Sequence, residues 1–306
     1  MAHFADRLAA AVRRCGNPVM VGLDPRWENL PAGLRSSHDG GDPERVAQAY
    51  ALFCRDVIDV VAPLVPVVKP QAAFFEQLGP PGLQALADTI SYAASEGLLV
   101  VIDGKRNDIG TTAAAYAAGY LGAAPVSAWG GDALTVSPYL GADSLDPFLD
   151  LAVERGAGVF VLVKTSNPGG GLFQDLVVQD GQRVYQHVAR FVQDAARRTA
   201  GTCGYGAVGA VVGATYPEQL AELRQAMPNT WLLVPGFGAQ GGAAEDVKHA
   251  FAADGLGAVV NNSRGIIFAH ERKEYRDQFP ADQWQRAVEA ATRSMIEQLR
   301  AVTTIG

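Results

Sequence analysis

The 306-residue sequence has little cysteine and little histidine, with three and five residues respectively. Cys15, Cys54 and Cys203 lie far apart and lack the spacing of metal ligands, so we interpret them as reduced thiols of a cytoplasmic protein. A disulfide framework and a zinc site are therefore not expected. The five histidines are equally scattered, which argues against a histidine-based metal site.

The chain also lacks a long apolar run and a block of basic residues. No stretch reaches the roughly 18 to 20 apolar residues of a membrane span. Residues 1–16 mix acidic and basic side chains through a helical pattern, which predicts an N-terminal helix rather than a signal peptide. The net charge of −7 argues against binding to nucleic acid or to a membrane surface, because both need a positive field. Anionic ligands must be bound locally.

Short apolar runs rich in β-branched residues recur along the chain, as expected of a globular protein in which 48% of the residues are hydrophobic. They lie at 18–24, 66–70, 98–105, 132–138, 158–165, 206–215, 230–238 and 257–265. Segments with helical spacing separate them, including 43–61, 80–95, 111–121, 182–199, 217–227 and 240–253. Strands this apolar are typical of parallel sheets covered on both faces.

Eight such β/α units predict a (β/α)8 TIM barrel of the α/β class. We expect one domain over residues 1–306, with an N-terminal helix and long polar loops at 28–44 and 164–182. A doubly wound open sheet is the main alternative. No Gly-x-Gly-x-x-Gly follows the first strand to support a dinucleotide-binding version of it.

The most informative segment is VIDGKRNDIGTT, 101–112, at the end of the third run. An extended strand turns alternate side chains to one face, so Asp103 and Lys105 should project together, with Asp108 just beyond the strand. A buried ammonium held between carboxylates keeps its proton and a fixed direction. That arrangement suits a group that delivers a proton to a reacting carbon. A structural ion pair at a strand terminus is the alternative interpretation.

The other predicted strands also end in polar or glycine residues. These ends are Asp24, Lys69, Ser137, Thr165 with Ser166, Gly213 with Thr215, 235–240 and 262–264. Active sites of barrels form at the carboxyl ends of the strands. Because buried charge is costly unless it is paired, two lysines and two aspartates at this end favour catalysis over a purely structural role.

Glycine-rich segments follow the seventh and eighth strands, at 235–242 and 261–265, where barrels often bind a phosphate. Glycines such as Gly238 and Gly265 expose backbone N–H groups at a helix start, where the helix dipole adds positive potential. Arg264 offers a planar two-pronged donor for phosphate oxygens, and Gln240 offers an amide N–H. The sequence therefore predicts a phosphate site here.

Taken together, these motifs resemble the orotidine 5'-phosphate decarboxylases, and specifically their longer bacterial (type 2) branch. The motifs in order are VGLDPRW, KPQAAFFE, DGKRNDIGTTAAAYA, DALTVSPYLG, KTSNPGG, VVGAT, PGFGAQGG and NNSRGI, which extend from 21 to 266. The resemblance implies a TIM barrel that converts orotidine 5'-monophosphate (OMP) to uridine 5'-monophosphate (UMP) in pyrimidine biosynthesis. It implies no cofactor and no metal.

Residue roles follow from the same resemblance. It implies a catalytic charged row made of Lys69, Asp103, Lys105 and Asp108. Asp24 and Lys69 would hold the ribose hydroxyls. Asp108 and Thr112 would contribute from the neighbouring subunit of a homodimer.

The resemblance also implies how the two ends of the nucleotide are bound. Ser166 would read the pyrimidine edge. Asn167 is the alternative for that role, because the 164–182 loop matches the family less well. Gln240 and Arg264 would grip the phosphate.

Three other functions remain open. Relatives with the same Asp-x-Lys-x-x-Asp pattern decarboxylate or synthesise keto-sugar phosphates with Mg²⁺, but they need a carboxylate where this chain has Lys69. A lysine Schiff-base aldolase is disfavoured, because Lys105 beside two aspartates should stay protonated and be a poor nucleophile. A non-catalytic barrel that binds nucleotide monophosphates is the third alternative.

Overall fold

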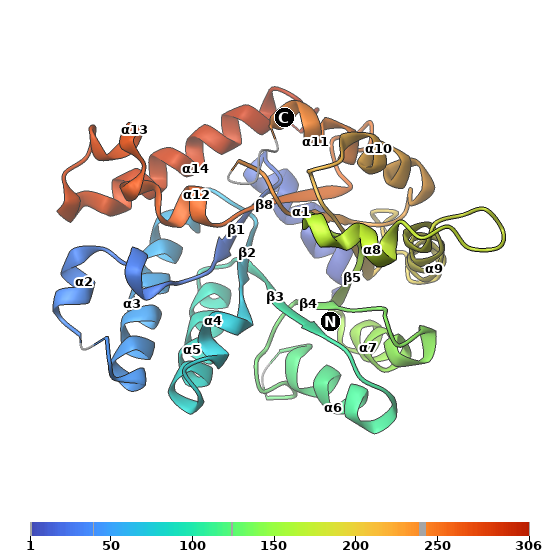
Figure 1. The fold of residues 1–306 in the computed structure, drawn as a ribbon, viewed down its shortest axis with the longest axis horizontal. Helices are drawn as coiled ribbons and strands as arrows, with labels where there is room; N and C mark the ends of the chain where they lie inside the picture. Colours follow the sequence, from blue (N-terminus) through green and yellow to red (C-terminus); the bar gives the residue numbers. More distant parts are fainter. Residues whose placement is uncertain (1, 39, 124, 239–242, 306) are drawn as a thin grey trace.

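The computed structural model describes residues 2–38, 40–123, 125–238 and 243–305. Eight parallel strands form a closed barrel in chain order, with the first strand paired to both the second and the eighth (Figure 1). The strands are β1 Val19–Leu23, β2 Val67–Pro70, β3 Leu99–Arg106, β4 Ala133–Val136, β5 Gly158–Lys164, β6 Val208–Val212, β7 Leu232–Val234 and β8 Ala258–Asn262. The predicted TIM barrel is confirmed, and the open-sheet alternative is wrong.

Helices surround the barrel (Figure 1). They are α1 Phe4–Cys15, α2 Ala32–Ser36, α3 Pro43–Val61, α4 Ala72–Glu76, α5 Pro80–Ser95, α6 Gly110–Tyr120, α7 Ala142–Arg155, α8 Gly171–Gln174, α9 Val184–Arg198, α10 Pro217–Ala226, α11 Ala244–Val247, α12 Arg264–Ile267, α13 Lys273–Arg276 and α14 Trp284–Arg300. The helix expected over 240–253 is wrong in extent: α11 is short and continues into a 3₁₀ turn, Lys248–Ala250. The two expected loops contain short helices, α2 and α8.

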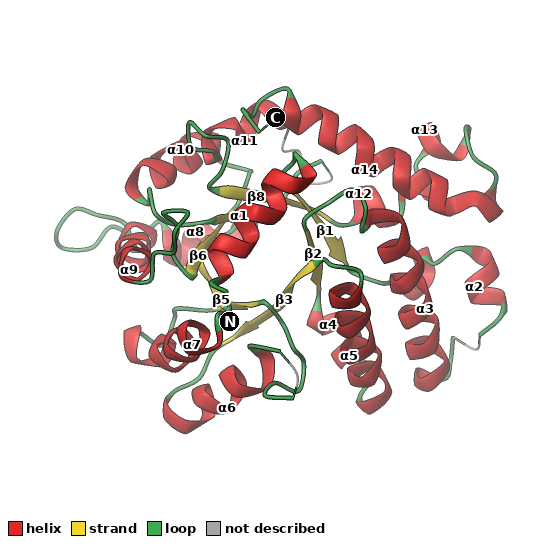
Figure 2. Cartoon of the chain, turned by 180° about the vertical axis from the view of Figure 1, so that it is seen from behind, coloured by secondary structure: helices red, strands yellow, loops and turns green. Residues whose placement is uncertain are grey.

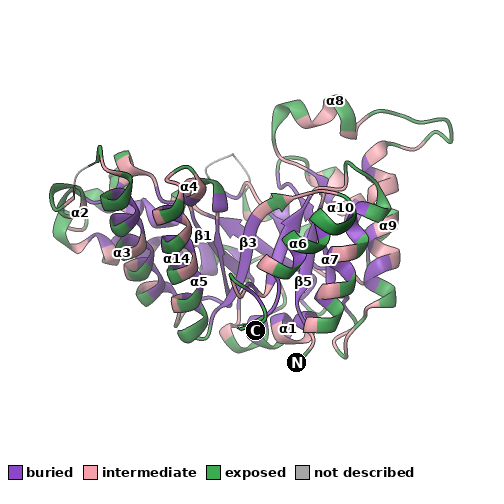
Figure 3. Cartoon of the chain, turned by 90° about the horizontal axis from the view of Figure 1, so that it is seen from below, coloured by how far each residue is buried: buried purple, intermediate pink, exposed green. Residues whose placement is uncertain are grey.

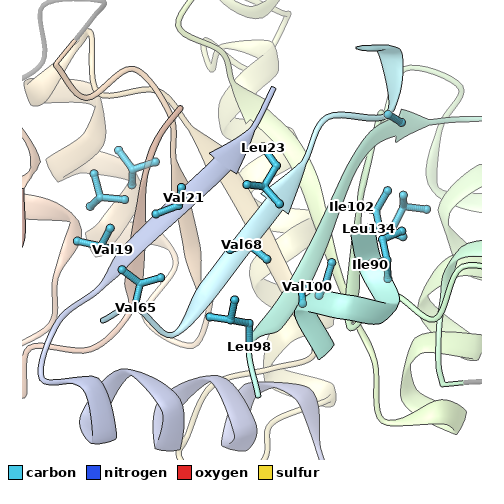
Figure 4. Packing of buried hydrophobic residues seen from close by; sticks show 14 of the residues in the cluster. Val19, Val21, Leu23, Val65, Val68, Ile90, Leu98, Val100, Ile102 and Leu134 are labelled. Carbon is cyan, nitrogen blue, oxygen red and sulfur yellow. The ribbon is translucent and has the colours of Figure 1, made fainter. Parts of the chain in front are cut away.

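The outward faces of the strands pack against the helical layer. Figure 4 shows this for β1 to β4, where Val21, Val68, Val100 and Ile102 belong to one buried cluster with residues of the surrounding helices. Strands buried on both faces explain why the sequence shows nearly continuous apolar runs rather than strict alternation. The helical layer and the barrel therefore share one extended core, which Figure 3 shows as the buried centre of the molecule.

The interior of the barrel is closed at the amino ends of the strands by α1. This helix crosses that opening in Figure 2, and its Phe4, Leu8 and Val12 join a second buried cluster made of inward-facing strand residues. The rings of Phe4 and Phe160 meet edge to face, with centroids 6.0 Å apart. A Cβ at Gly158 would lie 2.2 Å from the Phe4 ring, so only glycine fits there. The predicted N-terminal helix thus seals the end opposite the carboxyl edge.

Candidate active site

The carboxylate of Asp103 is the centre of the polar cluster at the carboxyl edge. Lys69 Nζ lies 2.7 Å from its Oδ2, and Lys105 Nζ lies 2.5 Å from its Oδ1. The amide of Gln71 donates to Oδ2 at 2.9 Å, and the hydroxyl of Thr135 donates to Oδ1 at 3.0 Å. Donors from β2, β3, β4 and the residue after β2 therefore hold one carboxylate in a fixed orientation.

The two buried charged residues of this cluster, Lys69 and Asp103, stabilise each other's charged forms. Burial alone would raise the pKa of Asp103, but the ammonium groups of Lys69 and Lys105 reverse that effect and hold its pKa well below the ordinary range. Burial would lower the pKa of Lys69, but the carboxylates of Asp103 and Asp24 raise it above its usual value. Asp103 is therefore ionised, and Lys69 protonated, at neutral pH.

Lys105 reaches Asp103 through an irregular backbone rather than through simple strand alternation. Its φ is +46°, and among the described residues it is the one non-glycine residue with positive φ. Its N–H donates to Thr135 Oγ1 at 2.9 Å, and the pairing of β3 with β4 shifts between Ile102 and Arg106. Such strained backbone is typical of functional sites.

The expectation of a buried Lys105 flanked by two aspartates is wrong for a single chain. The Lys105 side chain is 48% exposed. Asp108 lies beyond β3, where its carboxylate accepts a hydrogen bond from the N–H of Ile109 at 2.8 Å. Thr112 is exposed in the first turn of α6. Neither Asp108 nor Thr112 is among the described residues that line the two cavities beside Asp103.

Two cavities meet at the charged row. One, of about 170 Å³, is polar and lies between β1, β2 and the segments that follow β7 and β8; it is lined by Asp24, Lys69, Gln71, Asp103, Ser166, 235–237 and 261–264. The other, of about 340 Å³, has an apolar wall and is lined by Lys69, Asp103, Lys105, Thr135, Leu162, 165–167, Val211, Leu233 and Pro235. A planar ring with polar groups on its edge fits the second cavity, and a polar or anionic group fits the first.

Two acceptors in the polar cavity have no partner within the described part of the chain. They are Oδ1 of Asp24 and Oδ1 of Asn261, both buried. A buried polar atom without a partner costs about 1–3 kcal/mol. Asn261 is only 7% exposed, and its amide nitrogen donates to Ser263 Oγ at 3.3 Å. A ligand that carries hydroxyl groups would satisfy both acceptors.

The predicted phosphate site is only partly described. Arg264 is exposed and lines the polar cavity at the start of α12. The N–H of Gly265 donates to Asn262 Oδ1 at 3.1 Å, so this amide is already used within the protein. Gly238 has a φ of +74°, which favours glycine. Gln240 lies outside the described residues.

Sequence reasoning missed Gln71, Thr135 and Asn261. Ser137 was the expected polar end of the fourth strand, but its N–H donates to the carbonyl of Arg106, and Thr135 contacts Asp103 instead. Strand alternation could have found Gln71, because it lies two residues after Lys69. An asparagine in an apolar strand gives no comparable signal.

Within the described ranges, no three His, Cys, Asp or Glu side chains gather closely enough to hold a metal ion. Cys15, Cys54 and Cys203 are free thiols. No helix in the described part of the chain is both long enough and apolar enough to cross a bilayer.

The chain is similar to known proteins over most of its length. The chain is 59% identical over 302 residues to an orotidine 5'-phosphate decarboxylase from Rhodopirellula baltica, covering 98% of this chain and all of the relative. It is 48% identical to one from Deinococcus radiodurans, covering 82% of this chain and 84% of the relative. The solved structure of Leishmania donovani OMP decarboxylase superposes with a TM-score of 0.75 at 32% identity and covers 98% of both chains. A family profile matches residues 17–278, and the chain belongs to the orotidine 5'-phosphate decarboxylase / HUMPS family.

Proposed function

We propose that this protein decarboxylates OMP to UMP in pyrimidine biosynthesis. The observation that carries the proposal is the Lys69–Asp103–Lys105 row, fixed at the junction of a polar cavity and a more apolar one. The full-length similarity to curated decarboxylases supports it. We further propose that residues 1–306 act as one catalytic domain, because α1 and α14 both pack into the buried clusters of the barrel.

Lys105 is the proposed acid. Breaking the bond between C6 and the carboxylate releases CO2 and leaves an electron pair at C6 in the ring plane, where the π system cannot delocalise it. The ammonium of Lys105 stabilises this developing charge and then gives its proton to C6. Because the side chain is half exposed, the resulting amine can regain a proton from solvent once the product leaves.

Asp103 has two proposed effects. It orients Lys105 through their 2.5 Å contact. It also places a fixed negative charge near the substrate carboxylate. Like charges at short range disfavour the bound substrate, and this repulsion disappears when CO2 departs. Four donors keep Asp103 from turning away to relieve the repulsion.

The remaining residues bind the nucleotide. Asp24 and Lys69, with Asn261, hold the ribose hydroxyls, which the two unpartnered acceptors of the polar cavity support. Ser166, with Asn167 beside it, reads the pyrimidine edge from the rim of the second cavity. Arg264, Gln240 and the amides near Gly238 grip the phosphate. Binding energy far from C6 then helps to organise the charged row.

The proposal includes a homodimer in which Asp108 and Thr112 complete the partner's site. Its support is that both residues lie outside the cavities of their own chain, next to the exposed Ile109 at the start of α6. Mixing Lys105→Ala and Asp108→Ala subunits tests it. Random pairing leaves one intact site in each mixed dimer, so we expect about a quarter of the parent activity. If the mixture is no more active than either variant alone, the shared site is contradicted.

The decisive test of the reaction is an absorbance assay for the disappearance of OMP by the purified protein. EDTA separates this proposal from the Mg²⁺-dependent keto-sugar-phosphate enzymes: turnover of OMP should persist, whereas a metal-dependent enzyme would stop. Borohydride trapping with a carbonyl substrate would reveal a Schiff-base aldolase. A protein that binds UMP but never consumes OMP would be the non-catalytic barrel.

A further inference from the structure

A second buried lysine lies at the carboxyl edge, outside the charged row. Lys164 ends β5 and is 2% exposed. Its ammonium contacts Asp175 Oδ1 at 2.7 Å and lies over the rings of Tyr185 and Tyr216, at 5.5 and 5.3 Å. These contacts turn it toward α9 and α10 rather than toward the substrate cavities. A buried ammonium is costly unless it is paired, so the burial of Lys164 requires an explanation.

Tyr185 is itself held in place. Its hydroxyl donates to Glu222 Oε2 in α10 at 2.9 Å. Burial and the neighbouring Glu222 carboxylate raise the pKa of Tyr185 to about 12, so the ring remains neutral and its hydroxyl remains a donor. Two helices therefore fix the aromatic surface against which the Lys164 ammonium rests.

The residues next to this ion pair form a second link across the same loop. Gln174 Oε1 accepts from the Thr165 N–H at 3.1 Å, and Gln174 Nε2 donates to Thr165 Oγ1 at 2.8 Å. Lys164 and Thr165 thus bind the consecutive residues Asp175 and Gln174. We call these four residues the loop clasp. The clasp closes the base of a segment that carries α8 and rises above the barrel in Figure 3.

The clasp adjoins the residues proposed to read the base. Thr165 Oγ1 donates to Asn167 Oδ1 at 2.7 Å. On the other side, the Gly213 N–H donates to the Lys164 carbonyl at 2.8 Å, and a Cβ at Gly213 would lie 2.9 Å from Ser166 Cα. The backbone around Ser166 is therefore held between β6 and the clasp.

Hydrophobic packing contributes little to holding the segment itself. Its large apolar side chains are mostly exposed, at 53 to 69% for Leu172, Phe173, Leu176 and Val177. Polar contacts at the base of the loop therefore set its placement. Besides the clasp, the N–H of Val184 donates to the Leu176 carbonyl at 3.0 Å, and the Arg183 guanidinium lies 3.8 Å from Asp175 Oδ1.

We infer that Lys164 is a positioning residue, which acts through the clasp to hold Ser166 and Asn167 where they can bind the pyrimidine. This inference rests on the proposed function and extends it to a residue that does not touch the substrate. Without the clasp, only a fraction of the molecules would carry the loop in the binding-competent placement. The apparent affinity falls by that fraction, whereas turnover at saturation is preserved.

The main test is Lys164→Met, which keeps an unbranched stem and removes the ammonium. Asp175 is 35% exposed and can turn to water, so no unpaired buried charge remains. We expect the KM for OMP to rise about tenfold, with kcat within about twofold of the parent. Lys164→Arg keeps a positive charge, so its KM for OMP should rise less than that of Lys164→Met. Arg293→Met, which removes an exposed pair with Glu289 in α14, is the matched control and should change neither constant.

Chymotrypsin cleavage at Phe173 gives a readout that does not depend on activity. Removing the clasp should speed cleavage about tenfold, because the segment opens more often. If Lys164→Met fails to fold, Gln174→Leu breaks the other link of the clasp and should shift KM and cleavage in the same direction.

An unchanged KM together with unchanged cleavage would overturn the inference. A fall of kcat in proportion to kcat/KM would overturn it as well. If the parent protein itself fails to consume OMP, the proposed function fails, whereas the cleavage experiment still decides whether the clasp holds the loop.

Discussion

Replacing Asp103 with asparagine tests the charged row most directly. The carboxylate accepts four hydrogen bonds, two of them from ammonium groups. Asparagine has nearly the same shape but carries no charge, and its amide nitrogen would face a cation. Lys69, which is 4% exposed, would remain in the interior without its main counter-ion. Lys105 is half exposed and can turn toward water.

The loss of stability in Asp103→Asn follows from the different exposure of Lys69 and Lys105. Removing one partner of a buried ion pair destabilises a protein by about 3–5 kcal/mol. Because Lys105 can be rehydrated, the penalty comes mainly from Lys69, and we expect a loss of about 3 kcal/mol at pH 7. The folded-state pKa of Asp103 lies below its unfolded value, so its contribution is present above about pH 4 and is lost as the pH falls through the folded pKa. The gap between parent and variant should therefore narrow in acid.

Urea unfolding of both proteins at pH 7 and at successively lower pH measures this gap. Glu289→Gln is the control, because it neutralises one partner of an exposed pair and should cost less than about 0.5 kcal/mol. A loss below about 1 kcal/mol for Asp103→Asn at pH 7 would refute the reasoning. So would a gap that widens as the pH falls.

Three further variants test the remaining roles. Lys105→Ala should remove nearly all turnover of OMP, by about a hundredfold or more, because it deletes both the stabilising charge and the proton; turnover within tenfold of the parent would contradict this. Arg264→Ala should weaken UMP binding in calorimetry by about tenfold or more while leaving uridine binding unchanged. If UMP affinity is unaltered, the phosphate assignment fails. Asn261→Leu should raise the KM for OMP about tenfold, since a ribose hydroxyl loses its partner, and an unchanged KM would show that Asn261 does not bind the sugar.

The barrel could be predicted because a strand buried on both faces leaves a simple trace in the sequence. The run at 66–70 begins one residue before β2, Val67–Pro70, and the run at 98–105 is offset by one residue at both ends from β3, Leu99–Arg106. The helix expected over 240–253 is too long because the alanines of this region favour a helix. Among the described residues of this region, α11 covers only Ala244–Val247 and continues into the 3₁₀ turn Lys248–Ala250.

The identities of Asp103, Lys105 and Lys69 were predictable because charged residues at strand ends stand out. The conformation of Lys105 was not, since its positive φ arises where the pairing of β3 with β4 shifts, which is a tertiary effect. The roles that require a second chain follow from resemblance alone. Within its own chain, the Asp108 carboxylate accepts a hydrogen bond from the adjacent Ile109 N–H, which gives no sign of a partner subunit.

The position of α1 has a consequence for traffic through the protein. Phe4, Leu8 and Val12 fill the amino end of the barrel, so the barrel interior is open to solvent at the carboxyl end alone among the described residues. Substrate and both products therefore enter and leave at the carboxyl edge, where the two cavities lie. We expect this shared opening to determine the order in which carbon dioxide and the nucleotide leave.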